Sequence, residues 1–189
     1  AGQAPQKQRR SGTAQVDMPS VSVVIPALEE EESIGQVLAE IPCDYVDEVI
    51  VVDGDSRDGT ADVAEAAGAR VIREPRRGYG RACAAGAAAA RGDILIFLDA
   101  DGADDPGQIP DLLAPVLSGD ADLVLGSRLA GAIQSGAMPW HQRLGNRLAA
   151  QLIRRRYGLD LTDLSPLPAV RSETLRTLGM EEMTHGWPT

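Results

Sequence analysis

Short apolar runs alternate with longer amphipathic segments through the middle of the chain. Runs rich in Val, Ile and Leu are typical of strands that are buried on both faces of a sheet, whereas the segments between them have the length of helices. The pattern predicts strands at residues 21–25, 48–52, 70–72, 94–98 and 123–125. It predicts helices near residues 30–41, 60–67, 81–90 and 108–117. Because strands alternate with helices, we expect an α/β fold with a mostly parallel sheet and helices on both faces.

Polar and turn-forming residues gather at the carboxyl ends of four predicted strands. The four segments are Pro26-Ala27-Leu28-Glu29-Glu30, Asp53-Gly54-Asp55-Ser56, Asp99-Ala100-Asp101 and Gly126-Ser127-Arg128. Each of them alone is also typical of a turn or a helix N-cap. Right-handed crossovers bring the carboxyl ends of parallel strands to one edge of the sheet, where α/β proteins bind ligands. We therefore expect one ligand site at this edge.

The pair Asp99 and Asp101 suggests a metal ion at that edge. Alternate residues of an extended segment point the same way, so both carboxylates can face one point in space. Two anions repel each other there unless a cation lies between them. Carboxylate oxygens suit Mg²⁺ or Mn²⁺, which also bind substrate phosphates. The alternative is an ordinary loop that caps a helix beginning near Pro106.

Composition and charge narrow the class of protein. The chain has 189 residues, 43% of them hydrophobic, which fits one domain with a sizeable core. A formal net charge of −10 argues against a nucleic-acid binder. Cys43 and Cys83 indicate neither a disulfide framework nor a zinc site, so we expect a cytoplasmic protein. No run approaches the roughly 20 apolar residues of a membrane helix, and residues 1–18 predict a disordered leader.

In this order and at these spacings, the motifs resemble those of family 2 glycosyltransferases with the GT-A fold. Within that family the chain is similar to the dolichyl-phosphate mannose synthase-like group and its soluble bacterial relatives that use UDP-glucose. The resemblance implies a Rossmann-like GT-A domain over residues 19–189. Its nucleotide-sugar-binding half would be residues 19–130, and its acceptor-binding half, incomplete at the C-terminus, residues 131–189. The implied activity is a metal-dependent, inverting transfer of a sugar, glucose in this group, from a UDP-sugar to a small-molecule acceptor.

The resemblance also implies a role for individual residues. The nucleoside pocket would be lined by Pro26, Ala27, Leu28 and Glu30, and Asp53 would hydrogen-bond the base. The stretch Arg77-Gly78-Tyr79-Gly80-Arg81-Ala82 resembles a glycine-containing loop that approaches the donor, with Gly80 and Arg81 as its binding residues. Asp99, Ala100 and Asp101 would bind the ribose and the Mg²⁺ or Mn²⁺ ion. Arg128 would reach the donor phosphates or the acceptor. The chain departs from the family pattern at Glu29 and Gly54, where asparagine and a second aspartate are usual.

The last third of the chain bears on the acceptor. By resemblance Asp163 is the candidate general base, with a helix or turn cap as the competing interpretation. Pro168 replaces an arginine of the family motif, which leaves Arg171 as the cation of this segment. The sequence ends shortly after His185, where relatives lead into an acidic residue.

Two other functions stay open at this point. One is a glycosyltransferase that acts on a polyprenyl phosphate at the membrane surface, with GDP-mannose or UDP-glucose as donor. A helix over residues 140–157, with leucines near helical spacing and arginines between them, would then contact the membrane peripherally. The favoured interpretation of the same segment is a helix that packs its leucines on the domain and exposes its arginines to water. The other is a nucleotide-sugar-binding module without turnover. A homodimer is also compatible with the sequence.

Overall fold

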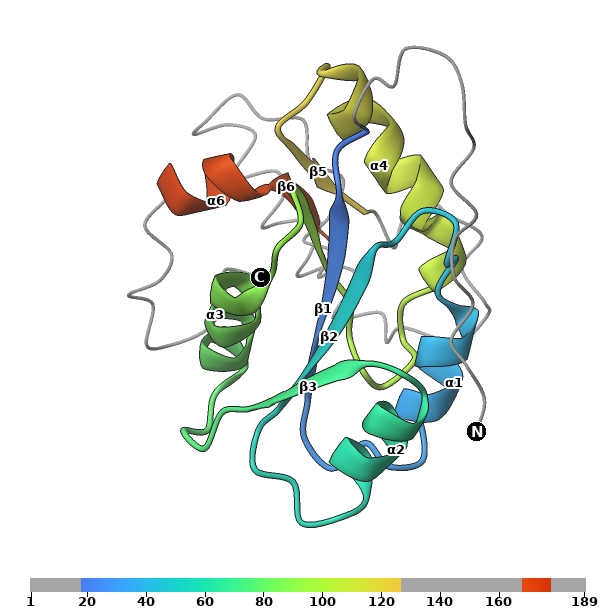
Figure 1. Ribbon diagram of the computed structural model, residues 1–189, viewed down its shortest axis with the longest axis vertical. Helices are drawn as coiled ribbons and strands as arrows, with labels where there is room; N and C mark the ends of the chain where they lie inside the picture. Colours follow the sequence, from blue (N-terminus) through green and yellow to red (C-terminus); the bar gives the residue numbers. More distant parts are fainter. Residues whose placement is uncertain (1–17, 127–167, 178–189) are drawn as a thin grey trace, which may run out of the picture.

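The computed structural model describes residues 18–126 and 168–177, and within them six strands form one sheet (Figure 1). The strands are β1 (Val21–Ala27), β2 (Glu48–Asp53), β3 (Arg70–Arg73), β4 (Ile94–Phe97), β5 (Leu123–Leu125) and β6 (Pro168–Arg171). Their order across the sheet is β3-β2-β1-β4-β6-β5. The pairs β1–β2, β1–β4 and β2–β3 are parallel, so the predicted mostly parallel sheet is confirmed.

Strand β6 is the one strand of the described sheet that the hydrophobic pattern did not predict. It pairs antiparallel with both β4 and β5, and in this way joins them. The strand is short and begins with Pro168, which is tolerated at the first position of a strand. Its direction carries Arg171 opposite Ile94, at the beginning of β4 and away from the carboxyl edge. There the Arg171 guanidinium contacts Asp122 at 3.3 Å, so it is not a cation of the predicted site.

Four of the five helices in the described residues follow the predicted order with shifted boundaries, and the last of the five was not predicted. They are α1 (Ile34–Glu40), α2 (Thr60–Ala66), α3 (Tyr79–Ala89), α4 (Ile109–Ser118) and α6 (Ser172–Thr177), with a 3₁₀ turn at Pro106–Gln108 before α4. The N-cap of that turn is Asp105, which accepts a hydrogen bond from the Gly107 N–H. None of these helices within the described ranges is long and apolar enough to cross a membrane.

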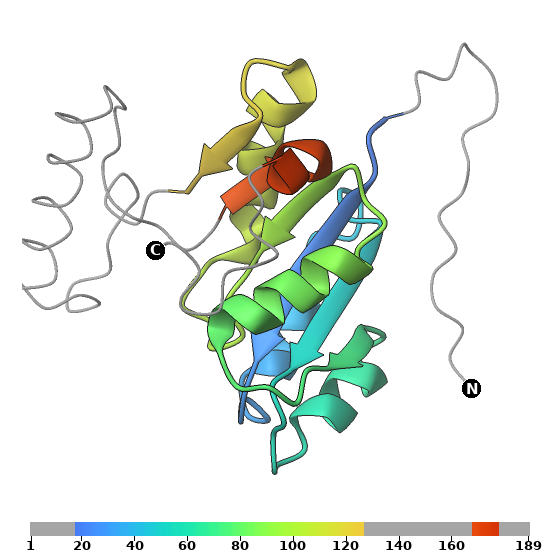
Figure 2. The same cartoon turned by 90° about the vertical axis from the view of Figure 1, so that its left-hand side faces the viewer.

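Helices cover both faces of the sheet, as Figures 1 and 2 show. Side chains of α1, α2 and α4 pack with Val23 and Ile25 of β1 on one face. Side chains of α3 and α6 pack with Val24 of β1 and Phe97 of β4 on the other. Because successive residues of β1 point to opposite faces, both clusters share this central strand. Because both faces are covered, the inner strands are nearly continuous apolar runs.

Gly86 sets how closely α3 approaches the sheet. A Cβ atom at this position would lie 2.3 Å from Val24 Cγ1 and 2.9 Å from Val52 Cγ2. Real carbon atoms do not approach so closely, so a side chain here would have to push the helix away from β1 and β2. The glycine therefore allows the helix and the sheet to meet at short range.

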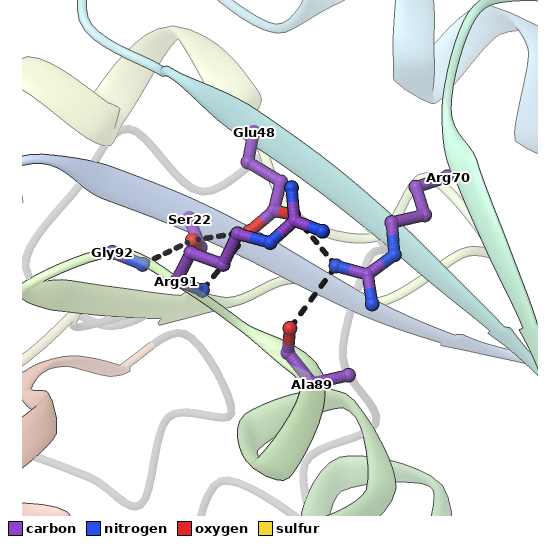
Figure 3. Close-up of polar contacts among 6 residues, drawn as sticks. All are labelled: Ser22, Glu48, Arg70, Ala89, Arg91 and Gly92. Atoms are coloured by element: carbon purple, nitrogen blue, oxygen red, sulfur yellow. Dashed lines mark hydrogen bonds and ion pairs between the residues drawn. The ribbon is translucent and has the colours of Figure 1, made fainter.

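A polar network around Glu48 ties the amino ends of the strands together (Figure 3). Its carboxylate accepts hydrogen bonds from Ser22 Oγ at 3.0 Å, the Arg91 N–H at 3.1 Å and the Arg70 guanidinium at 2.8 Å. The same Arg70 nitrogen donates to the Ala89 carbonyl at 3.0 Å. Burial by itself would raise the pKa of Glu48, but the hydrogen bonds from Arg91, Arg70 and Ser22 outweigh it and lower the pKa below its ordinary value.

Replacing Glu48 by Ala is expected to lower the free energy of unfolding by about 2 kcal/mol at pH 7, because the fully buried Ser22 hydroxyl and the Arg91 N–H lose their acceptor. The folded-state pKa lies below the unfolded-state value, so the carboxylate contributes fully above about pH 4.5. Its contribution is lost as the pH falls through the lower, folded-state pKa. Urea denaturation of both chains at neutral and acid pH measures this, and the difference between them should shrink in acid.

The matched control is Glu65→Ala, at an exposed glutamate near the end of α2. This change should alter the free energy of unfolding by no more than about 0.5 kcal/mol. An equal loss in both variants would contradict a stabilising role for the network.

Candidate functional site

A pocket of about 340 Å³ opens at the carboxyl edge of the sheet, between the ends of β1, β2 and β4 and the beginning of α3. Its lining residues are Pro26, Ala27, Leu28, Glu30, Gly54, Arg77, Gly78, Tyr79, Ala82, Asp99, Ala100 and Asp101. Within the described residues, three of the four predicted strand-end motifs thus contribute to one pocket. The fourth, Gly126-Ser127-Arg128, extends past the described residues at position 126.

The apolar wall of the pocket comes from the end of β1. Pro26 and Ala27 are held in register with Val52 and Asp53 of β2, and the Gly54 N–H extends this ladder by donating to the Ala27 carbonyl at 2.9 Å. After the strand, Leu28 is 44% exposed, which is unusual for a leucine beside a buried strand. The wall therefore offers an apolar surface on which a flat ligand can lie.

Two loops at the mouth of the pocket are joined by hydrogen bonds from backbone to side chain. The Glu29 N–H donates to Ser56 Oγ and the Glu30 N–H to Thr60 Oγ1, both at 2.9 Å. Both loops also contain a non-glycine residue with positive φ, Glu29 at 59° and Asp55 at 70°. This conformation costs roughly 1 kcal/mol per residue, so the hydrogen bonds hold a backbone that the isolated loops would not adopt.

Asp53 is a buried carboxylate next in sequence to the lining residue Gly54. It is 3% exposed, and its Oδ1 accepts a hydrogen bond from the Ser56 N–H at 3.2 Å. A carboxylate that is removed from water needs hydrogen-bond donors, because its desolvation is otherwise costly. Its burial at the end of β2 is compatible with a further donor on a ligand.

Asp99 accepts a hydrogen bond from a tyrosine that also lines the pocket. The Tyr79 hydroxyl donates to Asp99 Oδ1 at 2.8 Å. Partial burial, together with the neighbouring Cys83 and Asp99, raises the pKa of Tyr79 above its ordinary value, so the hydroxyl keeps its proton. Burial also raises the pKa of the Cys83 thiol to about 12, which makes it unreactive at neutral pH.

Asp101 lies two residues further along and is exposed. Its Oδ1 accepts a hydrogen bond from the Ala103 N–H at 2.9 Å, which closes a local turn. Among residues 18–126 and 168–177, no three or more His, Cys, Asp or Glu side chains cluster in a way that could hold a metal ion. Two carboxylates fit Mg²⁺ or Mn²⁺, which take their remaining ligands from water and phosphate oxygens. Such an ion would thus be shared between the protein and a phosphate-bearing ligand.

Positive charge also borders the pocket, in the segment between β3 and α3. Arg77 lines the pocket, and Arg76 is fixed nearby by a two-point contact with the buried Glu74, 2.8 Å from Nε to Oε1 and 2.8 Å from Nη2 to Oε2. These hydrogen bonds from Arg76 lower the pKa of Glu74 to about 2. Helix α3 begins at Tyr79 without a side-chain cap, so its positive dipole end also borders the pocket. The pocket therefore combines acidic and basic walls, as a metal–diphosphate ligand requires.

The structure brings most of the predicted site residues together. Pro26, Ala27, Leu28, Glu30, Asp99, Ala100 and Asp101 line the pocket. Asp53, Gly80 and Arg81 do not line it: Asp53 and Gly80 are buried, and Arg81 is half-buried on α3. Arg128 and Asp163 lie outside the described residues, as do the segment 140–157 and all but one residue of the predicted leader. The roles of all these residues in binding and catalysis stay predictions.

Five lining residues were not predicted as binding residues. They are Gly54, Arg77, Gly78, Tyr79 and Ala82. Four of these belong to the glycine-containing stretch 77–82, which leads into the first turn of α3 and of which the sequence singled out only Gly80 and Arg81. The sequence feature that could have identified them is the aromatic residue between the two glycines. Tyr79 is the first residue of α3, so its side chain can reach the ends of the neighbouring strands.

Comparison with known proteins identifies relatives over most of the chain. The family model for glycosyl transferase family 2 matches residues 22–177. An uncharacterised glycosyltransferase of Mycobacterium tuberculosis is 43% identical over 171 residues, which cover 89% of this chain and 75% of the relative. The low-salt glycan biosynthesis hexosyltransferase Agl6 of Haloferax volcanii is 39% identical over 151 residues, 77% of this chain and 36% of that protein.

Solved structures with the same fold include glucosyl-3-phosphoglycerate synthase from Mycobacterium tuberculosis. Its complex with Mn²⁺, UDP and glucosyl-3-phosphoglycerate matches with a TM-score of 0.67 and 31% identity over 83% of this chain. Its complex with Mg²⁺ and UDP matches with a TM-score of 0.65 and 32% identity. The match covers 58% of the solved chain, so the present chain corresponds to little more than half of that enzyme.

Proposed function

Because the chain belongs to glycosyltransferase family 2, we propose that it transfers a hexosyl group, glucose, from a UDP-sugar to a small-molecule acceptor with a divalent cation. The observation that carries the proposal is the pocket at the carboxyl ends of the strands, which Asp99 and Asp101 line together with Arg77. Several solved complexes of glucosyl-3-phosphoglycerate synthase contain Mn²⁺ or Mg²⁺ with UDP, and two contain Mn²⁺, UDP-glucose and phosphoglyceric acid. These complexes support the choice of donor, cation and acceptor class.

The nucleoside would lie against the apolar wall of Pro26, Ala27 and Leu28, with Glu30 at its edge. The buried Asp53 would accept a hydrogen bond from the imide N–H of uracil, which compensates part of the cost of its desolvation. An adenine base has no such N–H, so this contact would favour uridine, or another base that carries an imide N–H, over adenine. Gly80 and Arg81 would support the donor from α3 without lining the pocket themselves.

The diphosphate would lie between the two charged walls. Asp99 and Asp101 would hold Mg²⁺ or Mn²⁺, which acts as a Lewis acid that stabilises the leaving diphosphate. Arg77 and the uncapped beginning of α3 would face the same phosphates from the other side. Arranging these charges before the reaction reduces the reorganisation that the developing negative charge requires.

The acceptor would enter from the half of the chain that follows residue 130. Arg128 would contact the donor phosphates or the acceptor, and Asp163 would take the proton of an acceptor hydroxyl as general base. Attack on the anomeric carbon from the side opposite the diphosphate inverts that centre. Residues 19–130 would thus bind the donor and residues 131–189 the acceptor.

Calorimetric titration of the full chain with UDP and GDP, with and without Mn²⁺, tests the donor. We expect UDP to bind more tightly than GDP and more tightly with Mn²⁺ than without it. Release of UDP from UDP-glucose in the presence of small phosphorylated hydroxy acids then tests transfer, and the same assay with polyprenyl phosphate in vesicles tests a lipid acceptor. UDP binding without any transfer would indicate a binding module, and absence of Mn²⁺-dependent UDP binding would overturn the proposal.

A further inference from the structure

We propose that Tyr79 is a positioning residue of this pocket: its hydroxyl holds the Asp99 carboxylate in the orientation that binds the divalent cation. The inference rests on the proposed function, because it assigns the cation to Asp99 and Asp101. It goes further by making metal affinity depend on a side chain that is not itself a ligand of the metal.

The contact between the two residues is short and connects separate elements. The Tyr79 hydroxyl lies 2.8 Å from Asp99 Oδ1, and the residues are 20 positions apart, one at the beginning of α3 and the other just after β4. A hydrogen bond to a carboxylate is stronger than one between neutral groups. The terminal torsion of an aspartate is otherwise broadly distributed. The bond therefore selects one carboxylate orientation on a segment that has already left the regular sheet.

Tyr79 is well placed to impose this orientation, because its helix is firmly docked. Cys83, one turn further along α3, is fully buried beside it, and Gly86 lets the same helix approach β1 and β2 closely. The tyrosine itself keeps 40% of its surface exposed and lines the pocket. A docked helix with a partly exposed aromatic ring thus delivers one hydroxyl to a defined point at the strand ends.

Metal sites commonly depend on such outer contacts. Groups that hydrogen-bond to a ligating side chain fix its orientation, and their loss typically lowers metal affinity 10–100-fold. A simpler role for Tyr79 is a surface on which the donor packs. The two roles differ in the atoms that matter, because packing uses the ring and positioning uses the hydroxyl.

The test is Tyr79→Phe, which removes the hydroxyl and keeps the ring. UDP binding to the full chain is followed by calorimetry over a series of Mn²⁺ concentrations, and the concentration at half-maximal binding is compared with that of the wild-type chain. We expect it to rise about 10-fold in Tyr79→Phe. Metal-free UDP affinity and the thermal unfolding midpoint should stay unchanged, because the apolar wall and the core are untouched.

The control is Tyr45→Phe, at an exposed tyrosine between α1 and β2 on the other edge of the sheet, which should leave the Mn²⁺ requirement unchanged. An unchanged Mn²⁺ requirement in Tyr79→Phe, in a wild-type chain that does bind UDP with Mn²⁺, overturns the positioning role alone. An equal loss of metal-free and Mn²⁺-supported affinity in Tyr79→Phe overturns it as well. A wild-type chain without Mn²⁺-dependent UDP affinity overturns the proposed function and this inference together.

Discussion

Exchanging Asp101 for Asn is expected to lower Mn²⁺-dependent transfer from UDP-glucose at least about 100-fold, the scale on which loss of a charge-stabilising group acts in enzymes. Asn keeps a side-chain oxygen that can accept the hydrogen bond from the Ala103 N–H, so the local turn is retained. What is lost is one of the two negative charges that would hold the cation. Initial rates at several Mn²⁺ concentrations, together with the thermal unfolding midpoint, separate this loss from misfolding.

Asp105→Asn provides a closely matched control for this change. Asp105 is also exposed, and its Oδ1 accepts a hydrogen bond from the N–H two residues later at the same 2.9 Å, but it does not line the pocket. Its substitution should leave the rate and the Mn²⁺ dependence within about twofold of the wild-type values, since it removes an equal charge outside the site. If Asp101→Asn and Asp105→Asn behave alike, Asp101 is not a ligand of the cation.

Replacing Gly86 by Ala is expected to lower the free energy of unfolding by about 1–3 kcal/mol. Alanine is the better helix former by up to about 1 kcal/mol, so propensity alone predicts the opposite sign. The added Cβ would overlap Val24 and Val52, and relief requires α3 to move away from the sheet that it covers. Urea denaturation followed by circular dichroism measures the change.

Gly35→Ala separates crowding from helix propensity. This glycine also lies within a helix, α1, but a Cβ there would meet only Val63 Cγ1 at 3.3 Å, where a small shift of one side chain suffices. We expect this variant to be unchanged or slightly more stable. A Gly86→Ala chain as stable as Gly35→Ala would show that α3 is not held by close packing on β1 and β2.

The alternation of strands and helices was readable from the sequence because the sheet is covered on both faces. Its inner strands are nearly continuous apolar runs, which stand out from the amphipathic helices. The carboxyl-edge site followed from the same feature, because parallel strands end together and each end carries polar residues. The metal pair Asp99 and Asp101 and the wall of Pro26, Ala27 and Leu28 were therefore predicted to lie in one place, and they line one pocket.

The beginning of α1 was predicted four residues too early, and tertiary contacts give the reason. The acidic run from Glu29 favours a helix by propensity, but Glu29 itself has a φ of 59°, which is outside the helical range. The N–H groups of Glu29 and Glu30 donate to Ser56 and Thr60, which hold this conformation, and the helix begins only at Ile34. Contacts between residues almost 30 positions apart leave no local trace in the sequence.

Strand β6 and Tyr79 were missed for a similar reason. A four-residue strand that begins with Pro168 has too little pattern of its own, and its partners β4 and β5 are distant in the chain. Tyr79 is chemically unremarkable until the docking of α3 brings its hydroxyl to Asp99. Both features depend on contacts between elements that are distant in the chain. Composition and periodicity do not show these contacts.

The distance between the amino and carboxyl ends of the strands determines how strongly charges at the two ends affect each other. Strand β1 runs from the Glu48 network at Ser22 to the pocket at Leu28, about 20 Å at 3.3 Å per residue. This is about two and a half times the Debye length at physiological ionic strength, which is ~8 Å, so charges at one end of the strand have little effect on titration at the other. Acid unfolding through Glu48 and the pH dependence of ligand binding should therefore vary independently, and loops at the pocket can change their charge without altering the contribution of Glu48 to acid stability.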